Sequence, residues 1–284
     1  MKVIEPEDFE SVSCFFRGRK GHKRAEFIMR KLAIDKVNWV YDHSYAYRGA
    51  EFTSRLLNDV GVHYVVGNPE NLRSLKEGAF ITVSNHPYGG LDGIISIDLF
   101  AGIRPDYKFM VNKTLSMIKT LDDNFISVIP TGNKKTGISA ASLRGVRETI
   151  SHLHDGHPVG FFPSGAVSDF SLLDMRIRDR KWQDSILHVI HAAKVPVVPV
   201  RFFDRNSDFF YFLGLINWRI RSLRLPSEVF NKKGANPRIA IGRVIPVSEQ
   251  DQFDNPVDLG NFLRRIVYEM PLPVTFVSRN KLTF

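Results

Sequence analysis

Short apolar runs alternate along most of this chain with longer segments of helical periodicity, and this alternation constrains the fold more than any other feature. A strand followed by a helix and another strand favours parallel pairing, with the helix packed on the sheet. We therefore predict an α/β fold with a mainly parallel mixed sheet flanked by helices. Strands are expected over residues 63–67, 80–85, 107–112, 125–130, 158–163, 195–202 and 238–246, and helices are expected to begin near residues 91, 113, 136, 182 and 209.

The two ends of the chain are expected to be helical. Residues 1–60 precede the first strand and are predicted to form an N-terminal helical segment, while residues 61–284 form the main domain. Within that domain, the tail beyond residue 248 adds one predicted helix over residues 258–268. No internal repeat or low-complexity linker interrupts this organisation.

One segment presents a histidine where a strand gives way to a helix. Residues 84–92 read SNHPYGGLD, after a buried run and before an apolar helical segment. Ligands of parallel sheets bind beyond the carboxyl ends of the strands, so His86 is placed to reach a substrate. A carboxylate on one imidazole nitrogen leaves the other free to accept a proton, and Asp92 is the candidate carboxylate. The segment alone also fits a turn histidine beside a polar residue in the first helical turn, where negative charge is favoured.

Two further blocks decide between these interpretations. Residues 161–168 read FFPSGAVS, and residues 195–200 read VPVVPV. Together with the Asn-His block they resemble the phospholipid-synthesis acyltransferases, the PlsC-type superfamily that acts on glycerol phosphate and lysophosphatidate. In that family the histidine is the general base that takes the proton of an acceptor hydroxyl as it attacks an acyl thioester, and the aspartate orients the histidine. The resemblance implies these roles for His86 and Asp92.

The chain departs from the family pattern at two positions. Five residues separate His86 from Asp92 where the family has four. Gly89 and Gly90 can absorb the additional residue, because glycine adopts backbone angles that are closed to other residues. Ser164 stands in place of a family glutamate that belongs to the acceptor-binding half of the site. The second departure bears on the identity of the acceptor more than on the chemistry.

Both departures occur together in one subgroup, the hemolysin-like bacterial proteins and the O-acyltransferases of ornithine and glycine aminolipids. This chain is similar to that subgroup in further stretches, NSDFF at 206–210, LP at 225–226 and NKKG at 231–234. The resemblance implies a lyso-aminolipid acceptor, the hydroxyl of a 3-hydroxyacyl chain amide-linked to an amino acid. It also implies an acyl carrier protein thioester as donor, with coenzyme A as the alternative. A glycerophosphate acceptor, as in other members of the superfamily, stays open.

The resemblance also assigns substrate-binding residues. Lys134 and Lys135 occupy the region that supplies a basic residue for the acceptor's anionic headgroup, although exposed loop lysines are common. Gly165 and Ser168 are expected to shape the acceptor or thioester pocket, with Ser164 at its rim, and Asn85 and Pro163 are assigned as further substrate-binding residues. A serine nucleophile is disfavoured, because Ser164 is not in the Gly-x-Ser-x-Gly elbow of hydrolases.

Neither a metal nor a cofactor is expected beyond the thioester co-substrate. The single cysteine, Cys14, excludes a disulfide framework and a cysteine-rich metal site. His152 and His154 stand two residues apart, which on a helix directs them to different faces. Gly156 then ends that helix, and cations near a helix C-terminus explain these histidines without a metal.

The net charge of +9 and the isoelectric point near 9.6 predict an anionic partner. Nucleic acid is disfavoured because no recognition motif accompanies the charge, which leaves an acidic carrier protein and an anionic membrane surface. The chain has no secretory signal at its start and no apolar span of the roughly 20 residues that cross a bilayer. We therefore expect a cytoplasmic protein that binds peripherally to the inner face of the cell membrane.

Two segments are candidates for membrane contact. On a helix, residues 209–225 form an apolar stripe able to face the core, and the opposite side carries more aromatics with arginines on its flanks. The stripe comprises Phe209, Phe212, Leu213, Ile216, Ile220 and Leu223, and the flanking arginines are Arg219, Arg221 and Arg224. A helix buried on both sides or an acyl-chain tunnel fits the pattern equally well. Residues 20–42 are also basic and partly amphipathic, as a solvated helix would be.

The predicted function is a direct acyl transfer from a thioester to a lyso-lipid hydroxyl, with His86 as general base and no acyl-enzyme. A lysophosphatidate-type acyltransferase is the alternative within the same chemistry. A thioesterase that passes the acyl group to water and a lipid-binding protein without catalysis are the alternatives outside it.

Overall fold

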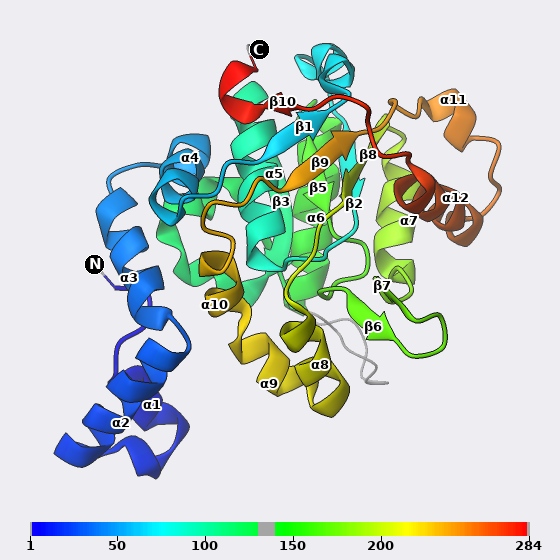
Figure 1. The fold of residues 1–284 in the computed structure, drawn as a ribbon. Coiled ribbons are helices and arrows are strands. Elements are labelled where there is room, and N and C mark those ends of the chain that lie inside the picture. The colour runs from blue at the N-terminus through cyan, green and yellow to red at the C-terminus, as the bar shows by residue number, and fades with distance from the viewer. Residues whose placement is uncertain (1, 130–139, 283–284) are drawn as a thin grey trace.

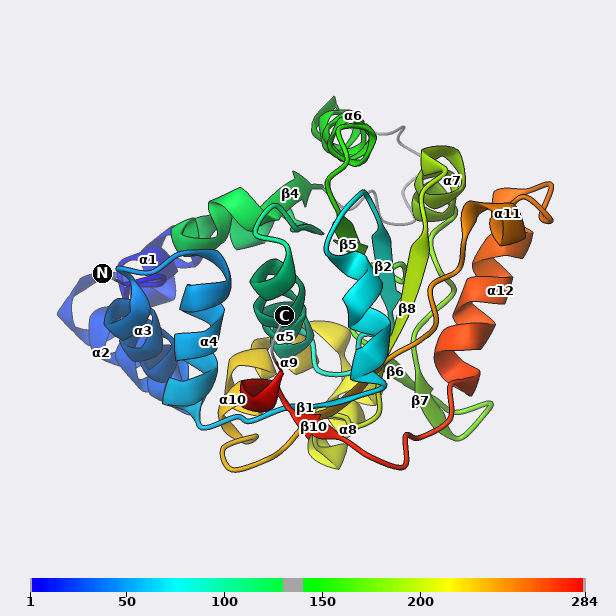
Figure 2. The ribbon, with the colours of Figure 1, turned by 90° about the horizontal axis from the view of Figure 1, so that it is seen from above.

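The computed structural model describes residues 2–129 and 140–282, with a central sheet that carries helices on both faces (Figures 1 and 2). In this part of the chain the sheet has eight strands, in the order β10-β1-β9-β8-β2-β5-β3-β4. Their bounds are β1 Val65–Gly67, β2 Ile81–Ser84, β3 Lys108–Asn112, β4 Phe125–Val128, β5 Val159–Phe161, β8 Val197–Phe202, β9 Arg238–Ile241 and β10 Val277–Ser278.

The sheet is mixed and mainly parallel, as predicted. β2 pairs in parallel with both β5 and β8, β3 pairs in parallel with β4 and β5, and β1 pairs in parallel with β9. The β8–β9 and β1–β10 pairs are antiparallel. Because β2 lies between β5 and β8, the segments that follow these three parallel strands meet at one edge of the sheet.

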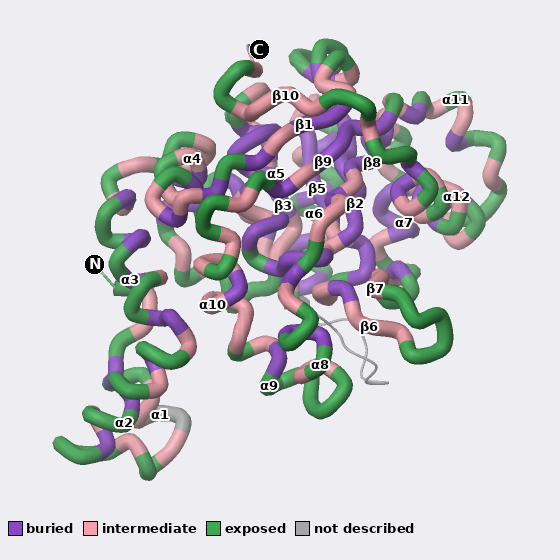
Figure 3. Tube along the Cα trace, in the orientation of Figure 1, coloured by how far each residue is buried: buried purple, intermediate pink, exposed green. Residues whose placement is uncertain are grey.

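Two hydrophobic clusters cover the two faces of the sheet. One contains α5 (Gly90–Ile103) with α3 (Ile34–Ser44) and α4 (Gly49–Val60), and the other contains α7 (Asp184–Ala193), α12 (Pro256–Glu269) and the end of α6 (Ala140–His154). Strand residues alternate between the clusters, so Val197 of β8 lies in the second and Val198 in the first. Buried residues are accordingly concentrated in the sheet and on the inner sides of these helices (Figure 3).

The N-terminal segment is helical, as predicted. It consists of α1 (Asp8–Val12), a 3₁₀ turn over Cys14–Phe16, α2 (Gly18–Lys31), α3 and α4. Figure 1 shows α1 and α2 extending away from the sheet, whereas α4 lies close to it. Because Val40 of α3 and Phe52 of α4 belong to the same core cluster as Leu91 of α5, packing continues across residue 60. The domain boundary at that position stays a prediction.

The single helix expected over residues 209–225 is wrong. The segment forms three short helices, α8 (Asp208–Ile216), α9 (Trp218–Leu223) and α10 (Leu225–Phe230). Asn217 interrupts the first helix, because its backbone is extended and its side chain accepts a hydrogen bond from the Arg219 amide at 2.8 Å, which caps α9. Pro226, in the first turn of α10, suits a helix start.

Further differences concern short elements. The helix expected from residue 113 is replaced by two 3₁₀ turns, Lys113–Met117 and Lys119–Asn124, and the strand expected to reach residue 246 ends at Ile241. The pattern did not reveal a two-stranded antiparallel hairpin of β6 (Asp169–Ser171) and β7 (Arg176–Arg178), the edge strand β10 or the short helix α11 (Val247–Gln250). In contrast, α12 includes the predicted helix over residues 258–268.

Candidate active site

His86 and Asp92 form the pair that the sequence predicted, in spite of the longer spacing. Nδ1 of His86 lies 2.9 Å from Oδ2 of Asp92. Asp92 is fully buried, while 15% of the His86 side chain is exposed. Among the described residues, Nε2 of His86 has no protein hydrogen-bond partner. With Nδ1 protonated and donating to Asp92, Nε2 is the nitrogen that is able to accept a proton from a substrate.

Gly89 accommodates the additional residue. Its φ of +81° and ψ of −120° are in a region that glycine reaches without strain, and a Cβ there would lie 2.6 Å from Cδ2 of Leu225. This turn directs the backbone amides of Tyr88 and Gly89 at Oδ2 of Asp92, with bonds of 2.8 and 3.0 Å. The same oxygen therefore accepts from His86 and from two backbone amides, which fixes the carboxylate relative to the ring.

Burial raises the pKa of the Asp92 carboxyl above its ordinary value, although the bonds from His86, Tyr88 and Gly89 oppose this shift. Asp92 Oδ1 is buried without a hydrogen-bond partner in the described part of the chain. A carboxylate in this environment gains more from a neighbouring imidazolium than it would in water. It therefore stabilises the charged histidine that forms when His86 takes up a proton.

The second predicted block lies beside the histidine because β5 and β2 are neighbours. Val83 of β2 is in register with Phe161 of β5, so the segments that follow these two strands leave the sheet at the same edge. The ring of Phe162 stacks on the imidazole of His86, with centroids 3.8 Å apart and planes at 17°. Ser168 returns to the same loop, where its backbone amide donates to the His86 carbonyl oxygen at 2.8 Å.

The predicted substrate-binding residues of these loops have well-defined structural contacts. The Asn85 side chain donates to the Phe202 carbonyl oxygen at 2.9 Å and accepts from the Phe202 amide at 2.8 Å, so it joins the His86 loop to the end of β8. Ser164 is buried and donates to the Ala166 carbonyl oxygen at 2.8 Å, whereas it was expected at the rim of the pocket. Substrate contact by these residues stays a prediction.

Pro163 and Gly165 bring the loop close to α7. The Pro163 carbonyl oxygen accepts from the Gln183 amide at 2.8 Å. Gly165 has a φ of +65°, and a Cβ at this position would collide with the Gln183 side chain. A larger residue at position 165 would therefore displace the Gln183 side chain, which donates to the Ser164 carbonyl oxygen at 3.2 Å, and would strain the backbone.

Asp179 belongs to the site although nothing in the sequence pattern singled it out. Its Oδ1 accepts from the backbone amide of His86 at 3.1 Å and from the hydroxyl of Ser168 at 2.5 Å. Its own backbone donates to the Tyr268 hydroxyl at 2.7 Å and accepts from Arg264 at 3.0 Å. Asp179 therefore joins the His86 loop and the Ser168 loop to α12, and burial raises the pKa of its carboxyl group. An aspartate outside the quoted blocks gave no signal by which sequence reasoning could find it.

Arg221 is buried, which corrects the expectation that it lies on the flank of a membrane-facing helix. It forms an ion pair with Asp169 and donates to the Ser168 carbonyl oxygen at 3.0 Å. Arg224 pairs with Glu228 at 3.6 Å, and Arg219 is the exposed member of the three. Arg221 thus attaches α9 to the loop that contacts His86.

The remaining predictions concern the headgroup lysines, a metal site and a membrane-spanning helix. Lys134 and Lys135 lie outside the described residues. Across residues 2–129 and 140–282, no three His, Cys, Asp or Glu side chains come together as metal ligands would, and His152 and His157 both bond to Asp106. In the same ranges, no helix has the length and apolar character that a bilayer-crossing segment needs.

A histidine that is hydrogen-bonded to a buried carboxylate, at the carboxyl ends of parallel strands, is an arrangement able to take a proton from a nucleophile. The model of the Acyltransferase family matches residues 15–271, and the chain therefore belongs to that family. It is an acyltransferase, and the resemblance found in the sequence is confirmed.

Two relatives named lyso-glycine lipid O-acyltransferase are similar over most of the chain. The protein of Bacteroides thetaiotaomicron is 28% identical over 244 residues, covering 83% of this chain and 85% of its own length. The protein of Phocaeicola vulgatus is 26% identical over 243 residues, covering 83% of each chain. Among solved structures, the 1-acyl-sn-glycerophosphate acyltransferase PlsC of Thermotoga maritima aligns over 85% of this chain and 89% of its own, with a TM-score of 0.46 and 18% identity.

Proposed function

We propose that this acyltransferase moves a fatty acyl group from an acyl thioester to the hydroxyl of a lyso-aminolipid, an amino acid that carries an amide-linked 3-hydroxyacyl chain. The observation that carries the proposal is the 2.9 Å contact between His86 Nδ1 and Asp92 Oδ2, which leaves Nε2 available to the acceptor. The names of the two relatives support the choice of acceptor.

The proposed reaction is a direct transfer that uses no cofactor. The acceptor oxygen attacks the thioester carbonyl carbon while Nε2 of His86 takes the hydroxyl proton. The tetrahedral intermediate then collapses, the C–S bond breaks, and the leaving thiolate takes the proton back from the imidazolium. Asp92 stabilises the imidazolium between these two proton transfers. General-base catalysis of this kind contributes about 10²- to 10⁴-fold, and positioning of the two substrates supplies much of the remainder.

We also propose that the enzyme works on a membrane surface as a peripheral protein. The apolar stripe of residues 209–223, which the sequence left able to face the core, is largely exposed, with Phe212 at 54%, Ile216 at 62% and Ile220 at 47%. Phe210 and Tyr211 of α8 are buried in its place. Trp218 of α9 and, in the adjoining β6–β7 hairpin, Leu172, Leu173 and Met175 are exposed as well. Apolar side chains exposed singly over a surface are normal, but here they gather on elements that contact one another, α8 with α9 and α8 with β6, which marks an interaction surface.

A lipid surface is the partner that fits this group, because the proposed acceptor is itself a lipid. Arg180 and Arg219 line a pocket of about 370 Å³ at the break between α8 and α9, beside the exposed Ile216 and Trp218. Aromatic side chains bordered by arginine are typical of segments that lie in a membrane interface. The lipid acceptor would then reach the active site directly from the bilayer, without first passing into water.

The proposal is tested with purified protein and acyl carrier protein that carries a labelled acyl chain. The acceptors offered are N-(3-hydroxyacyl)glycine, N-(3-hydroxyacyl)ornithine and lysophosphatidate, each also tested with acyl coenzyme A. Labelled diacylated aminolipid is the expected product. If only lysophosphatidate becomes labelled, the acceptor is a glycerophospholipid and the aminolipid assignment is wrong. Labelled free fatty acid would indicate a thioesterase, and an unconsumed donor in every mixture would indicate a lipid-binding protein without catalysis.

A further inference from the structure

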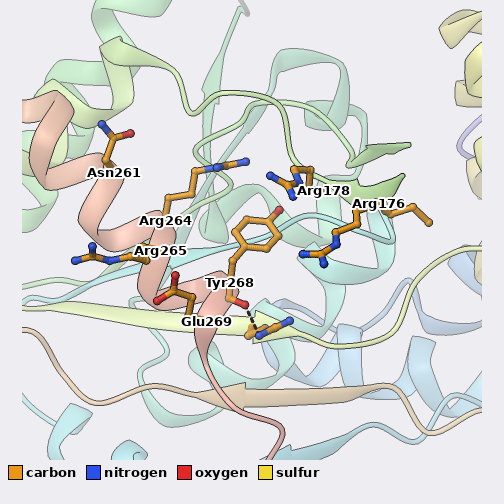
Figure 4. A pocket seen from close by; sticks show the side chains of 9 residues that line it. Arg176, Arg178, Asn261, Arg264, Arg265, Tyr268 and Glu269 are labelled. Carbon is orange, nitrogen blue, oxygen red and sulfur yellow. Dashed lines mark hydrogen bonds between the residues drawn. The ribbon is translucent and has the colours of Figure 1, made fainter. Parts of the chain in front are cut away.

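A strongly basic pocket lies between β7, β8 and α12 (Figure 4), and two of its lining residues, Arg264 and Tyr268, bond to the backbone of Asp179. It has a volume of about 440 Å³, and five of its nine lining residues are arginines, against one glutamate, Glu269. The arginines are Arg176, Arg178, Arg201, Arg264 and Arg265. Charge of one sign that is gathered in a hollow concentrates the electrostatic potential there, so this pocket attracts anions. Nothing in the acyl-transfer site described above uses it.

The arginines differ in how far the protein already engages them. Arg201 donates to carbonyl oxygens at the C-terminal end of α12, at 2.5 Å to Tyr268 within the helix and at 2.6 Å to Met270 directly after it. In Figure 4, Arg176, Arg178 and Arg264 point toward the Tyr268 ring, while Arg265 points away from them.

Arg176 and Arg178, on β7, are the lining arginines that a ligand can use. Arg178 has an ion pair with Asp174 at 3.3 Å, in which 36% of the Arg178 side chain and 43% of the Asp174 side chain are exposed, and such solvent-accessible pairs are weak. The Arg176 side chain has neither a hydrogen bond nor an ion pair within the described ranges, although its backbone pairs with Ser171 in the β6–β7 hairpin. Planar guanidinium groups bind phosphate oxygens through two parallel hydrogen bonds, which makes a phosphate the ligand that suits them best.

The position of the pocket relative to His86 suggests which phosphate it binds. Tyr268 and Arg264, which form its wall, bond directly to the backbone of Asp179, and the carboxylate of Asp179 bonds to the backbone of His86. One residue therefore separates the pocket wall from the catalytic loop. Acyl carrier proteins and coenzyme A both carry the acyl group on a pantetheine arm that begins at a phosphate. We propose that the pocket binds this phosphate and so directs the thioester toward His86, an inference that rests on the proposed function.

The proposal is tested by the double variant Arg176→Gln/Arg178→Gln of the full chain. Its matched control is Arg144→Gln/Arg147→Gln, which removes two exposed charges from α6. Binding of 4′-phosphopantetheine and of pantetheine, which lacks the phosphate, is measured by calorimetry. We expect the wild type and the control to bind phosphopantetheine at least tenfold more tightly than pantetheine, and the pocket variant to lose that difference. Equal binding of both compounds by the wild type, or an unchanged pocket variant, would overturn the proposal.

Steady-state kinetics with S-acyl phosphopantetheine and S-acyl pantetheine then distinguish a failure of phosphate binding in the pocket from a failure of acyl transfer. The pocket variant is expected to raise KM for the first donor about tenfold and to leave kcat, and KM for the second donor, unchanged. If every donor is inert while phosphopantetheine still binds in the pocket, the proposed function fails and the phosphate site stands. If the pocket variant instead loses binding to phosphatidylglycerol vesicles and keeps its donor KM, the phosphate is that of a lipid headgroup and the donor assignment is refuted.

Discussion

The carboxylate of Asp179 accepts a hydrogen bond from the backbone amide of His86 at 3.1 Å, and it holds the hydroxyl of Ser168 through the same oxygen at 2.5 Å. One buried oxygen therefore fixes both loops that meet at the candidate active site. Because Asp179 contacts the backbone of His86 and not its ring, we assign it a positioning role.

Replacing Asp179 tests that role. Asp179→Ala leaves the amide of His86 and the hydroxyl of Ser168 without an acceptor, and an unsatisfied buried polar group costs about 1–3 kcal/mol. We expect the free energy of unfolding to fall by that order and kcat to fall at least tenfold. Asp179→Asn keeps the accepting oxygen and should restore most of both quantities, with an unchanged pH profile. If Asn is as inactive as Ala although it is stably folded, the carboxylate has a direct chemical role.

His86→Ala should reduce kcat by the general-base contribution of about 10²- to 10⁴-fold or more. The fold should persist, because the backbone bonds of residue 86 to Asp179 and Ser168 remain and the ring is partly exposed. His188→Ala on α7 is the matched control, since that side chain is exposed and, within the described part of the chain, bonds only to its own helix, at the Asp184 carbonyl oxygen. Turnover retained by His86→Ala, measured with whichever donor and acceptor the wild type uses, would refute the assignment.

The turn before Asp92 provides a pair of glycines with opposite expectations. Gly89→Ala places a side chain at a φ of +81° and against Leu225 and Val167, so we expect it to cost about 1–3 kcal/mol of stability and most of the activity. Gly90→Ala meets nothing within 4 Å and has an ordinary φ at the start of α5, so it should be neutral or slightly stabilising. Urea unfolding measures the free energy of unfolding of both variants and of the wild type. Equal effects would mean that Gly89 is not what absorbs the additional residue.

These expectations also show how far the sequence could lead. Ser84 and Phe161 end neighbouring strands, so the meeting of their loops followed from the alternation of strands and helices. The pairing of His86 with Asp92 followed from the resemblance together with the freedom of Gly89. Asp179 could not be found this way, because it is 93 residues from His86 and its contact depends on how the β6–β7 hairpin folds back. Periodicity also identified residues that share a helix face, such as Phe212 and Ile216, but not whether the protein covers that face.

Burial of Asp92 predicts a pH dependence with a definite sign. Its pKa in the folded protein is above the ordinary value of about 3.9, so between these two pKa values the folded state binds more protons than the unfolded state. The stability that this group contributes therefore falls as the pH rises through that window. Asp92→Asn removes the titration, and the difference in unfolding free energy between wild type and variant should shift in favour of the variant with rising pH. A difference that is flat, or that moves toward the wild type, would contradict a raised pKa.

We expect the exposed apolar face of α8 and α9, and not the N-terminal helices, to be the membrane-binding segment. Phe212→Ser/Trp218→Ser/Ile220→Ser alters only side chains that are 47–58% exposed, so stability should change little. Each large side chain removed from the bilayer costs about 1.5–3 kcal/mol of insertion, and binding to vesicles of mixed neutral and anionic lipid should fall more than tenfold.

Two further variants test whether the loss of vesicle binding is specific to α8 and α9. Leu143→Ser/Ile150→Ser removes exposed apolar side chains from α6 and should bind vesicles as the wild type does. Phe27→Ser/Trp39→Ser tests α2 and α3, whose exposed aromatics are surrounded by basic residues. Vesicle cosedimentation measures all three. If only the variant in α2 and α3 loses binding, the N-terminal helices hold the protein on the membrane, and the exposed face of α8 and α9 has a partner other than lipid.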